Sequence, residues 1–232
     1  ELHEMNATKD KFFSIISHDL KNPALAQRNA LQALVNDAAE LDAESLSHYY
    51  AMLLKSADAQ VELLYNLLDW ARVQTDRIPF TPVTFSLSRV VEDEVSLMHM
   101  PIESKSIRLT VDVSDDLCAN ADRNMVATVL RNLLTNAIKF SHPDGRIAIS
   151  ARQDGAWITV SVADDGVGMS ADKLRTLFDA GREQSTRGTR GETGSGLGLV
   201  VCKHFVERNG ARLTAHSEES RGTTFHFTLK AK

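Results

Sequence analysis

The first third of the chain places apolar side chains at helical spacing. Leu2, Met5, Phe12 and Ile16 follow steps of three, four and seven residues. A second, longer stripe consists of Leu46, Tyr50, Leu53, Ala57, Val61, Leu64, Leu68 and Ala71. This period predicts two long helices with one apolar face each, separated by a break near residues 40–44, where Asp42 can cap the second helix. Two helices bury little surface alone, so we expect a homodimeric four-helix bundle; packing of both helices on the rest of the chain is the alternative.

Beyond residue 80 the pattern alternates between strands and helices. Pro79 and Pro82 disfavour helix before them and mark a linker at residues 79–84. Helices are expected over residues 88–103, from a cap at Asp122 to Phe140, and over 198–208. Strands are expected over residues 107–113, 146–152, 157–163, 212–216 and 223–229. We therefore predict a multidomain α and α/β protein: a helical hairpin at 1–78, the linker, and an α/β sandwich at 85–232, with helices on one face of a mixed sheet.

Composition and charge narrow the class of protein. Of 232 residues, 43% are apolar and 25% charged, which fits a packed core and excludes a mostly disordered chain. The net charge of -5 arises in the helical part, so a general nucleic-acid partner is not expected. No apolar run reaches the roughly 18 residues of a membrane helix. Two cysteines build no disulfide framework and fit a reducing compartment.

The first motif whose residues could carry out chemistry is Ser17-His18-Asp19-Leu20-Lys21-Asn22-Pro23. A neutral imidazole is a nucleophile near neutral pH, and the Asp19 carboxylate can set the protonation of His18. Asn22 lies four residues on and shares the helical face of His18, where its amide can position water or a phosphoryl oxygen. Taken alone, a histidine on a helix is more often an ordinary surface residue.

A second motif, residues 132–140, places Asn132, Asn136 and Lys139 on one face of a helix. Amides suit Mg²⁺ or phosphate, and lysine supplies a point charge; a plain polar outer face is the alternative. In a third motif, residues 162–169, a strand ends at Asp164, whose carboxylate can accept from an exocyclic amine such as that of adenine. Gly166 and Gly168 then let backbone approach a planar ring, although Asp-Gly alone means only a turn.

The fourth motif has glycines at Gly194, Gly196 and Gly198 where a helix begins. Amides at a helix N-terminus favour phosphate, but the spacing matches neither a dinucleotide fold nor a P-loop. By itself it can be a flexible hinge. The stretch before it carries Arg182, Arg187 and Arg190 among small residues. It can form a lid whose cations meet a triphosphate, or a loop with solvated charges.

The order of these motifs along the chain resembles the catalytic core of a two-component sensor histidine kinase. SHDLKNP is similar to its H-box, NLLTNAIKF to its N-box, DDGVGM to its G1-box, Leu177-Phe178 to its F-box and GSGLGL to its G2-box. The resemblance implies a dimerisation and histidine-phosphotransfer domain at 1–78 and a GHKL-type ATP-binding domain at 85–232. The sequence departs from the family pattern after Phe178, where many relatives carry a second aromatic residue.

The resemblance also implies roles for individual residues. His18 would accept the γ-phosphate of ATP through Nε2, Asp19 would orient the ring and accept its proton, and Asn22 would place water for dephosphorylating a response regulator. Asn136 would hold Mg²⁺. The nucleotide-contacting set would be Asn132, Asn136, Lys139, Phe140, Asp164, Gly166, Gly168, Met169, Arg182, Arg187, Gly194, Gly196, Leu197, Gly198, Leu199 and Thr224, with Arg182 and Arg187 as rival lid cations.

The same resemblance implies ATP and Mg²⁺ as cofactors and the receiver domain of a response regulator as partner. It implies the cytoplasmic part of a longer sensor, with membrane contact only through segments outside this sequence. Two other classes compete. A clamp-type GHKL ATPase would share the nucleotide motifs but lack the His-Asp-x-x-Asn stretch, and a silent scaffold would have lost the acceptor or Mg²⁺ position, whereas His18 and Asn136 are intact.

Overall fold

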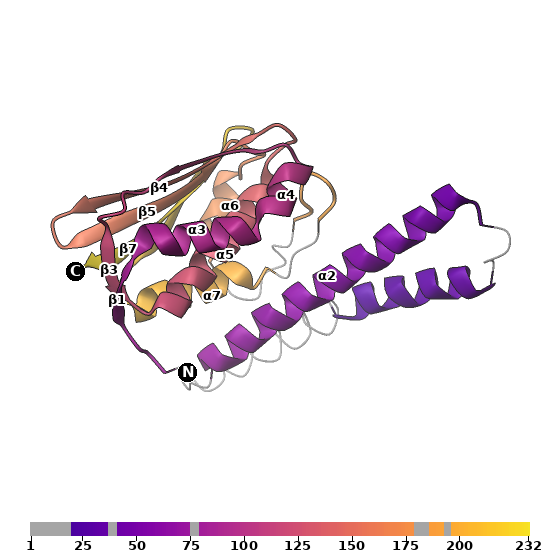
Figure 1. Ribbon diagram of the computed structural model, residues 1–232, viewed down its shortest axis with the longest axis horizontal. Coiled ribbons are helices and arrows are strands. Elements are labelled where there is room, and N and C mark those ends of the chain that lie inside the picture. Colours follow the sequence, from indigo (N-terminus) through magenta and orange to yellow (C-terminus); the bar gives the residue numbers. More distant parts are fainter. Residues whose placement is uncertain (1–19, 37–40, 75–78, 179–185, 193–195) are drawn as a thin grey trace.

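A computed structural model describes residues 20–36, 41–74, 79–178, 186–192 and 196–232. Helical residues 20–36 and helix α2 (Ala43–Gln74) form a hairpin, which contacts the other domain through α2 and α7 (Figure 1). Asp42 caps α2 as expected, since its Oδ1 accepts from the Ser45 amide at 2.8 Å. The first helix runs through Pro23, whose carbonyl accepts from the Ser56 hydroxyl at 3.3 Å across the hairpin.

The inner face of the hairpin is centred on Ala30, Ser56 and Leu63, which are all buried. The predicted stripe of α2 lies on a different side of this helix. Its members Tyr50, Val61, Leu64 and Leu68 are between 43 and 59% exposed in the single chain. Among the described residues of one copy, none covers this apolar face.

The second domain is an α/β sandwich. Its strands are β1 (Val83–Ser86), β2 (Arg108–Asp112), β3 (Cys118–Ala121), β4 (Arg146–Asp154), β5 (Trp157–Asp164), β6 (Leu213–Glu218) and β7 (Gly222–Ala231). They form one mixed sheet in the order β1-β3-β7-β5-β4-β2, with β6 paired to β7 and β2–β4 the parallel pair. Its helices are α3 (Leu87–Leu97), α4 (His99–Ser104), α5 (Arg123–Phe140), α6 (Ala171–Arg175) and α7 (Gly198–Arg208).

The helices cover one face of the sheet, as predicted (Figure 1). The inward residues of β5 and β7, such as Val160 and Phe227, are buried against α5 and α7 in one continuous core. The alternate residues, including Ser161 and His226, form the open polar face, where the Ser161 hydroxyl and His226 Nδ1 lie 2.7 Å apart. This alternation decides which side chains of each strand can reach a site between sheet and helices.

The structure corrects the single helix expected over residues 88–103. The chain forms α3 and α4 with a break at Met98, because Pro101 has no amide to continue the hydrogen-bond ladder of α3. Pro101 instead lies in the first turn of α4, where a missing donor is tolerated. Strands β1 and β3 and helix α6 were not expected. The domain boundaries at 78 and 85 remain a prediction.

Candidate nucleotide-binding site

Helix α5 presents the predicted polar face. Asp122 caps it, with Oδ1 accepting from the amides of Asn124 and Met125 at 3.1 Å each. Residues such as Leu130 and Leu133 are buried against the sheet and fix the rotation of the helix. The opposite side therefore carries the half-buried residues Asn132, Asn136 and Lys139. Within the described part of the chain, no hydrogen bond occupies the side-chain amide of Asn136.

The start of α7 lies directly against this polar face. A Cβ added to Gly198 would come within 2.4 Å of Asn132 Oδ1, and Asn132 Nδ2 donates to the Thr128 carbonyl at 3.0 Å. Gly196 has a φ of 68°, in the left-handed region that favours glycine. Buried Leu197 and half-buried Leu199 pack on the core, which leaves the first-turn amides of α7 beside Asn132. Amides and an asparagine face together suit phosphate.

Asp164 ends β5 on the inner face of the sheet. Its Oδ1 accepts from the Gly166 amide at 2.9 Å. Burial raises the pKa of this carboxyl to about 6, against the lowering effect of hydrogen bonds from the backbone at Gly166 and Thr223. A half-buried carboxylate of this kind can recognise an amine donor, because in its ionised form it accepts hydrogen bonds and donates none.

The turn after Asp164 packs tightly against the end of α5. A Cβ on Gly166 would come within 2.2 Å of the Phe140 carbonyl, which accepts from the Val167 amide at 3.1 Å. Gly168, with a φ of 63°, lies so close to the Glu218 carbonyl that a Cβ would be 1.9 Å away. Half-buried Met169 packs on the core from the same turn. The end of α5 and the turn after β5, which carry the second and third motifs, are therefore packed against each other.

The position expected for the threonine of β7 requires a correction. Thr224 pairs with Ala163 and points to the open face of the sheet, away from Asp164. Thr223 lies opposite Asp164 in the register, is 8% exposed and shares the inner face. The alternation of Phe225, Phe227 and Leu229 already favoured residue 223, because strand neighbours two apart share a face.

Some predicted residues lie outside the described part of the chain, namely His18, Asp19, Arg182 and Gly194. Asn22 is exposed on the first helix of the hairpin, and Arg187 is exposed in the short segment 186–192. Among the described residues, no group of three or more His, Cys, Asp or Glu side chains is arranged to hold a metal ion. An amide such as Asn136, acting together with nucleotide phosphates, is the kind of partial ligand that Mg²⁺ accepts.

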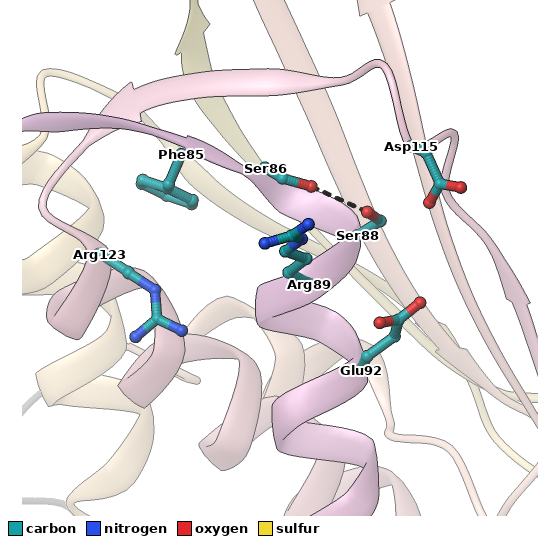
Figure 2. A pocket seen from close by; sticks show the side chains of 7 residues that line it. All are labelled: Phe85, Ser86, Ser88, Arg89, Glu92, Asp115 and Arg123. Atoms are coloured by element: carbon teal, nitrogen blue, oxygen red, sulfur yellow. Dashed lines mark hydrogen bonds between the residues drawn. The ribbon is translucent and has the colours of Figure 1, made fainter.

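A different hollow lies at the far end of the domain. This cavity of about 680 Å³ is lined by residues of β1, α3 and their neighbours, among them Ser86, Ser88, Arg89 and Arg123 (Figure 2). None of the predicted nucleotide residues lines it. Its two arginines are matched by Glu92 and Asp115, and the Ser86 and Ser88 hydroxyls bond to one another at 2.9 Å, so its charge favours no particular ligand.

The fold and this site define the ATP-binding domain of the histidine kinase, DNA gyrase B and HSP90-like ATPases, whose family model matches residues 121–232. Residues 8–76 match the His Kinase A phospho-acceptor domain. Together the two models cover most of the chain, in the order that a sensor histidine kinase has them. The chain therefore carries the two domains of a sensor histidine kinase catalytic core.

Individual relatives agree with this assignment. The sensor-like histidine kinase SenX3 of Mycobacterium bovis is 27% identical over 228 residues, which are 98% of this chain and 55% of that protein. The crystal structure of histidine kinase ThkA in complex with response regulator protein TrrA has a TM-score of 0.77 at 18% identity and covers 99% of this chain and 64% of that one. Full-length ShkA in complex with AMPPNP has a TM-score of 0.64 at 21% identity and covers 94% and 46%. The chain spans about half the length of the curated relatives it matches.

Two further findings bear on the expectations from the sequence. No helix among the described residues is both long and apolar enough to cross a membrane. Cys202 is fully buried, and burial raises the pKa of its thiol; Cys118 is half-buried in β3.

Proposed function

We propose that this chain is an ATP-dependent protein-histidine kinase that phosphorylates itself on His18 and passes the phosphoryl group to an aspartate of a response regulator. One observation carries the proposal. The asparagine face of α5 lies beside the start of α7 and its end packs on the Asp164 turn, in a chain whose residues 8–76, which include His18, match a phospho-acceptor domain.

The adenine end of the site is formed by Asp164, Thr223 and the glycine turn. The Asp164 carboxylate accepts from the exocyclic amine, and the Thr223 hydroxyl, on the same face, lies beside it. Gly166 and Gly168 keep this wall free of side chains, so that the ring can approach the backbone. Guanine presents a carbonyl where adenine presents the amine, so the carboxylate disfavours GTP.

The phosphate end lies between α5 and α7. Asn132 and the first-turn amides of α7 face one another there, and Lys139 adds a positive charge one turn beyond Asn136. Mg²⁺, held by Asn136 and the phosphates, would neutralise charge that develops during transfer. Arg187, or Arg182, approaches the γ-phosphate from the stretch before the glycines.

Transfer to the histidine is a simple displacement. His18 Nε2 attacks the γ-phosphorus, an N–P bond forms, and the bond from phosphorus to the β–γ bridging oxygen breaks to release ADP. The Nδ1 proton of the resulting imidazolium passes to the Asp19 carboxylate. Asn22, four residues from His18 on the helix, places water for hydrolysis of the phosphorylated regulator.

We also propose a homodimer through the hairpin, with a receiver domain docking near His18. Support comes from the exposed apolar stripe of α2 and from the phospho-acceptor match. Histidine kinase ThkA, which shares this fold, has been crystallised in complex with a response regulator protein. A cytoplasmic location is part of the same proposal, because ATP is available there.

The test uses γ-labelled ATP with Mg²⁺, followed by separate acid and alkali treatment. A phosphohistidine loses its label in acid and keeps it in base. His18→Gln should remove the label while calorimetry shows unchanged ATP binding, and His48→Gln, on exposed α2, is the matched control that keeps it. Label retained on His18→Gln would refute the assignment of the acceptor.

A further inference from the structure

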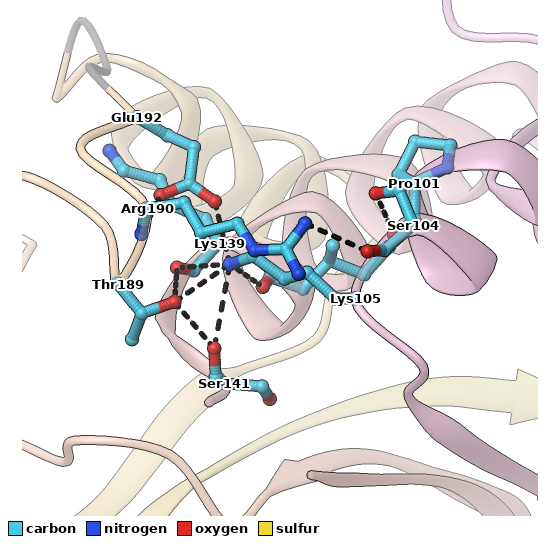
Figure 3. Close-up of polar contacts among 9 residues, drawn as sticks. Pro101, Ser104, Lys105, Lys139, Ser141, Thr189, Arg190 and Glu192 are labelled. Carbon is cyan, nitrogen blue, oxygen red and sulfur yellow. Dashed lines mark hydrogen bonds and ion pairs between the residues drawn. The ribbon is translucent and has the colours of Figure 1, made fainter. Parts of the chain in front are cut away.

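A buried lysine lies behind the phosphate end of the site. Lys105 follows α4, and its side chain is 3% exposed. Five oxygen atoms lie within 3.4 Å of its Nζ (Figure 3). A buried ammonium without such partners would be strongly unfavourable, so this arrangement constrains every group that takes part in it.

Three of the five oxygens end helix α5. Lys105 Nζ donates to the carbonyls of Ile138 and Lys139 at 2.8 and 3.0 Å and lies 3.4 Å from that of Ser141. The last carbonyls of a helix lack partners within the helix and carry its negative dipole end. Lys105 therefore fixes the turn of α5 that carries Lys139 and Phe140.

The other two oxygens come from the segment 186–192. Thr189 Oγ1 lies 2.8 Å and Glu192 Oε1 2.6 Å from Lys105 Nζ. Burial raises the pKa of the Glu192 carboxyl, but hydrogen bonds from Lys105 and nearby amides outweigh this, and the pKa lies below its usual value. The ion pair joins residues that are far apart in the sequence.

Backbone contacts complete the attachment of this segment. The Thr189 amide donates to the Lys139 carbonyl at 3.1 Å, and the Gly188 amide donates to the Glu192 carbonyl at 2.8 Å. Gly188 has no room for a side chain, because a Cβ would lie 2.6 Å from Lys139 Cγ. The Arg190 guanidinium donates to the carbonyl of Ser104, the residue before Lys105, at 2.7 Å.

Residues on both sides of the glycine-rich motif thus contact helix α5 or the lysine that holds its end. Before it, Glu192 is held by Lys105; after it, Gly198 lies against Asn132. Both contacts rest on α5, at its end and in its middle.

We propose that Lys105 is a positioning residue for phosphoryl transfer: through Thr189 and Glu192 it clamps the segment 186–192 onto the end of α5 and so places Lys139 and the start of α7 around the phosphates of ATP. The Lys105–Glu192 clamp rests on the proposed function. It touches neither nucleotide nor His18, and acts only through the groups it holds.

The test compares Lys105→Met, Glu192→Gln and the double variant with wild type. If the clamp positions phosphate contacts, the KM for ATP in autophosphorylation should rise about tenfold in each single variant. The double variant should be no worse than the poorer single, because both partners of one interaction are then absent. Asp93→Asn on α3, which removes the surface ion pair with Arg123 at the start of α5, is the matched control and should leave KM unchanged.

A purely structural role gives a different result. Loss of folded protein lowers kcat through the active fraction and leaves KM as it was, and that outcome refutes the clamp. Glu192→Gln keeps size and shape, so the comparison survives if Lys105→Met folds poorly. If wild type itself neither binds ATP nor becomes labelled, the proposed function is wrong and the clamp falls with it. If wild type is active and both single variants keep its KM, only the clamp is wrong.

Limited trypsin digestion adds a readout independent of turnover. Arg187 and Arg190 are exposed and lie in the clamped segment. Release of this segment should speed cleavage after these two residues about tenfold in Lys105→Met, whereas Asp93→Asn should be cut at the wild-type rate. Equal rates in all three proteins would contradict the clamp.

Discussion

Asp164 is expected to lower stability while it serves recognition, and Asp164→Asn separates the two effects. Burial raises the pKa of this carboxyl from an ordinary value of 3.8 to about 6. Each pKa unit corresponds to about 1.4 kcal/mol, so the ionised carboxylate destabilises the domain by up to about 3 kcal/mol above pH 6. Asparagine carries no charge to desolvate and still accepts from the Gly166 amide. The variant should therefore be more stable than wild type at pH 7.5, by as much as this amount.

The sign of the pH dependence follows from the direction of the shift. As pH falls from 6 to 4, the wild-type carboxyl takes up a proton in the folded state before the unfolded state does. Its unfavourable contribution disappears over that window, so the advantage of Asp164→Asn should shrink and be absent near pH 4. The asparagine variant itself has no such titration.

The assay is urea unfolding followed by tryptophan fluorescence. In a Trp70→Phe background the remaining tryptophan is Trp157 in β5, which reports on the ATP-binding domain. In parallel, calorimetry should show ATP affinity reduced roughly 10- to 100-fold, the value of a charged hydrogen bond. An asparagine variant less stable than wild type at pH 7.5, or one whose difference in stability from wild type is the same at pH 7.5 and pH 4.5, would refute the account of Asp164.

Three further changes test other parts of the structure. Gly198→Ala should force the Asn132 side chain to rotate, because its Oδ1 lies 2.4 Å from the added carbon. Calorimetry should then show ATP affinity reduced about tenfold, with a change in the free energy of unfolding below about 1 kcal/mol; unchanged affinity would contradict the contact. Leu64→Glu places a charge in the exposed stripe and should shift the chain from dimer to monomer in light scattering, whereas Lys55→Glu, on the opposite side of α2, should not. Asp122→Ala removes the cap of α5 and the bonds from Thr81, and urea unfolding should show about 2–4 kcal/mol less stability; a loss below about 0.5 kcal/mol would count against this role.

The elements that could be predicted from the sequence are those with local signals. Asp122 before an apolar period gave the start of α5, and alternation gave β4, β5 and β7. Strand β3 has the sequence Cys-Ala-Asn-Ala, with no β-branched residue, and forms because β1 and β7 lie on either side of it. Its pairing partners are too distant in sequence for any local pattern to reveal.

The same distinction applies to the site. Asn132, Asn136 and Asp164 follow from helical spacing and a strand end, and the structure brings their elements together. Thr224 was expected in the site, but the two-residue period of the strand places Thr223 on the inner face instead. No local sequence pattern predicts that Lys105 is buried, because its partner Thr189 is 84 residues away and a lysine before a strand is ordinarily a surface residue.

The charged side chains that the fold buries all contact helix α5. Among the described residues, the buried charged side chains are Glu94, Lys105 and Asp122. Asp122 caps the start of α5, and Lys105 holds its last carbonyls. Glu94 from α3 accepts two hydrogen bonds from Arg131 in the middle of α5, at 2.9 and 3.0 Å.

Apolar packing alone would hold α5 on the sheet, but it tolerates small slides and rotations along the helix axis. Buried charges do not, because any displacement leaves a desolvated group without its partner. Three such contacts, at the start, middle and end of α5, therefore fix the axial position of this helix more sharply than its hydrophobic face can. That precision matters for Asn132, Asn136 and Lys139, since phosphoryl transfer depends on positioning and charge neutralisation more than on covalent chemistry by the protein.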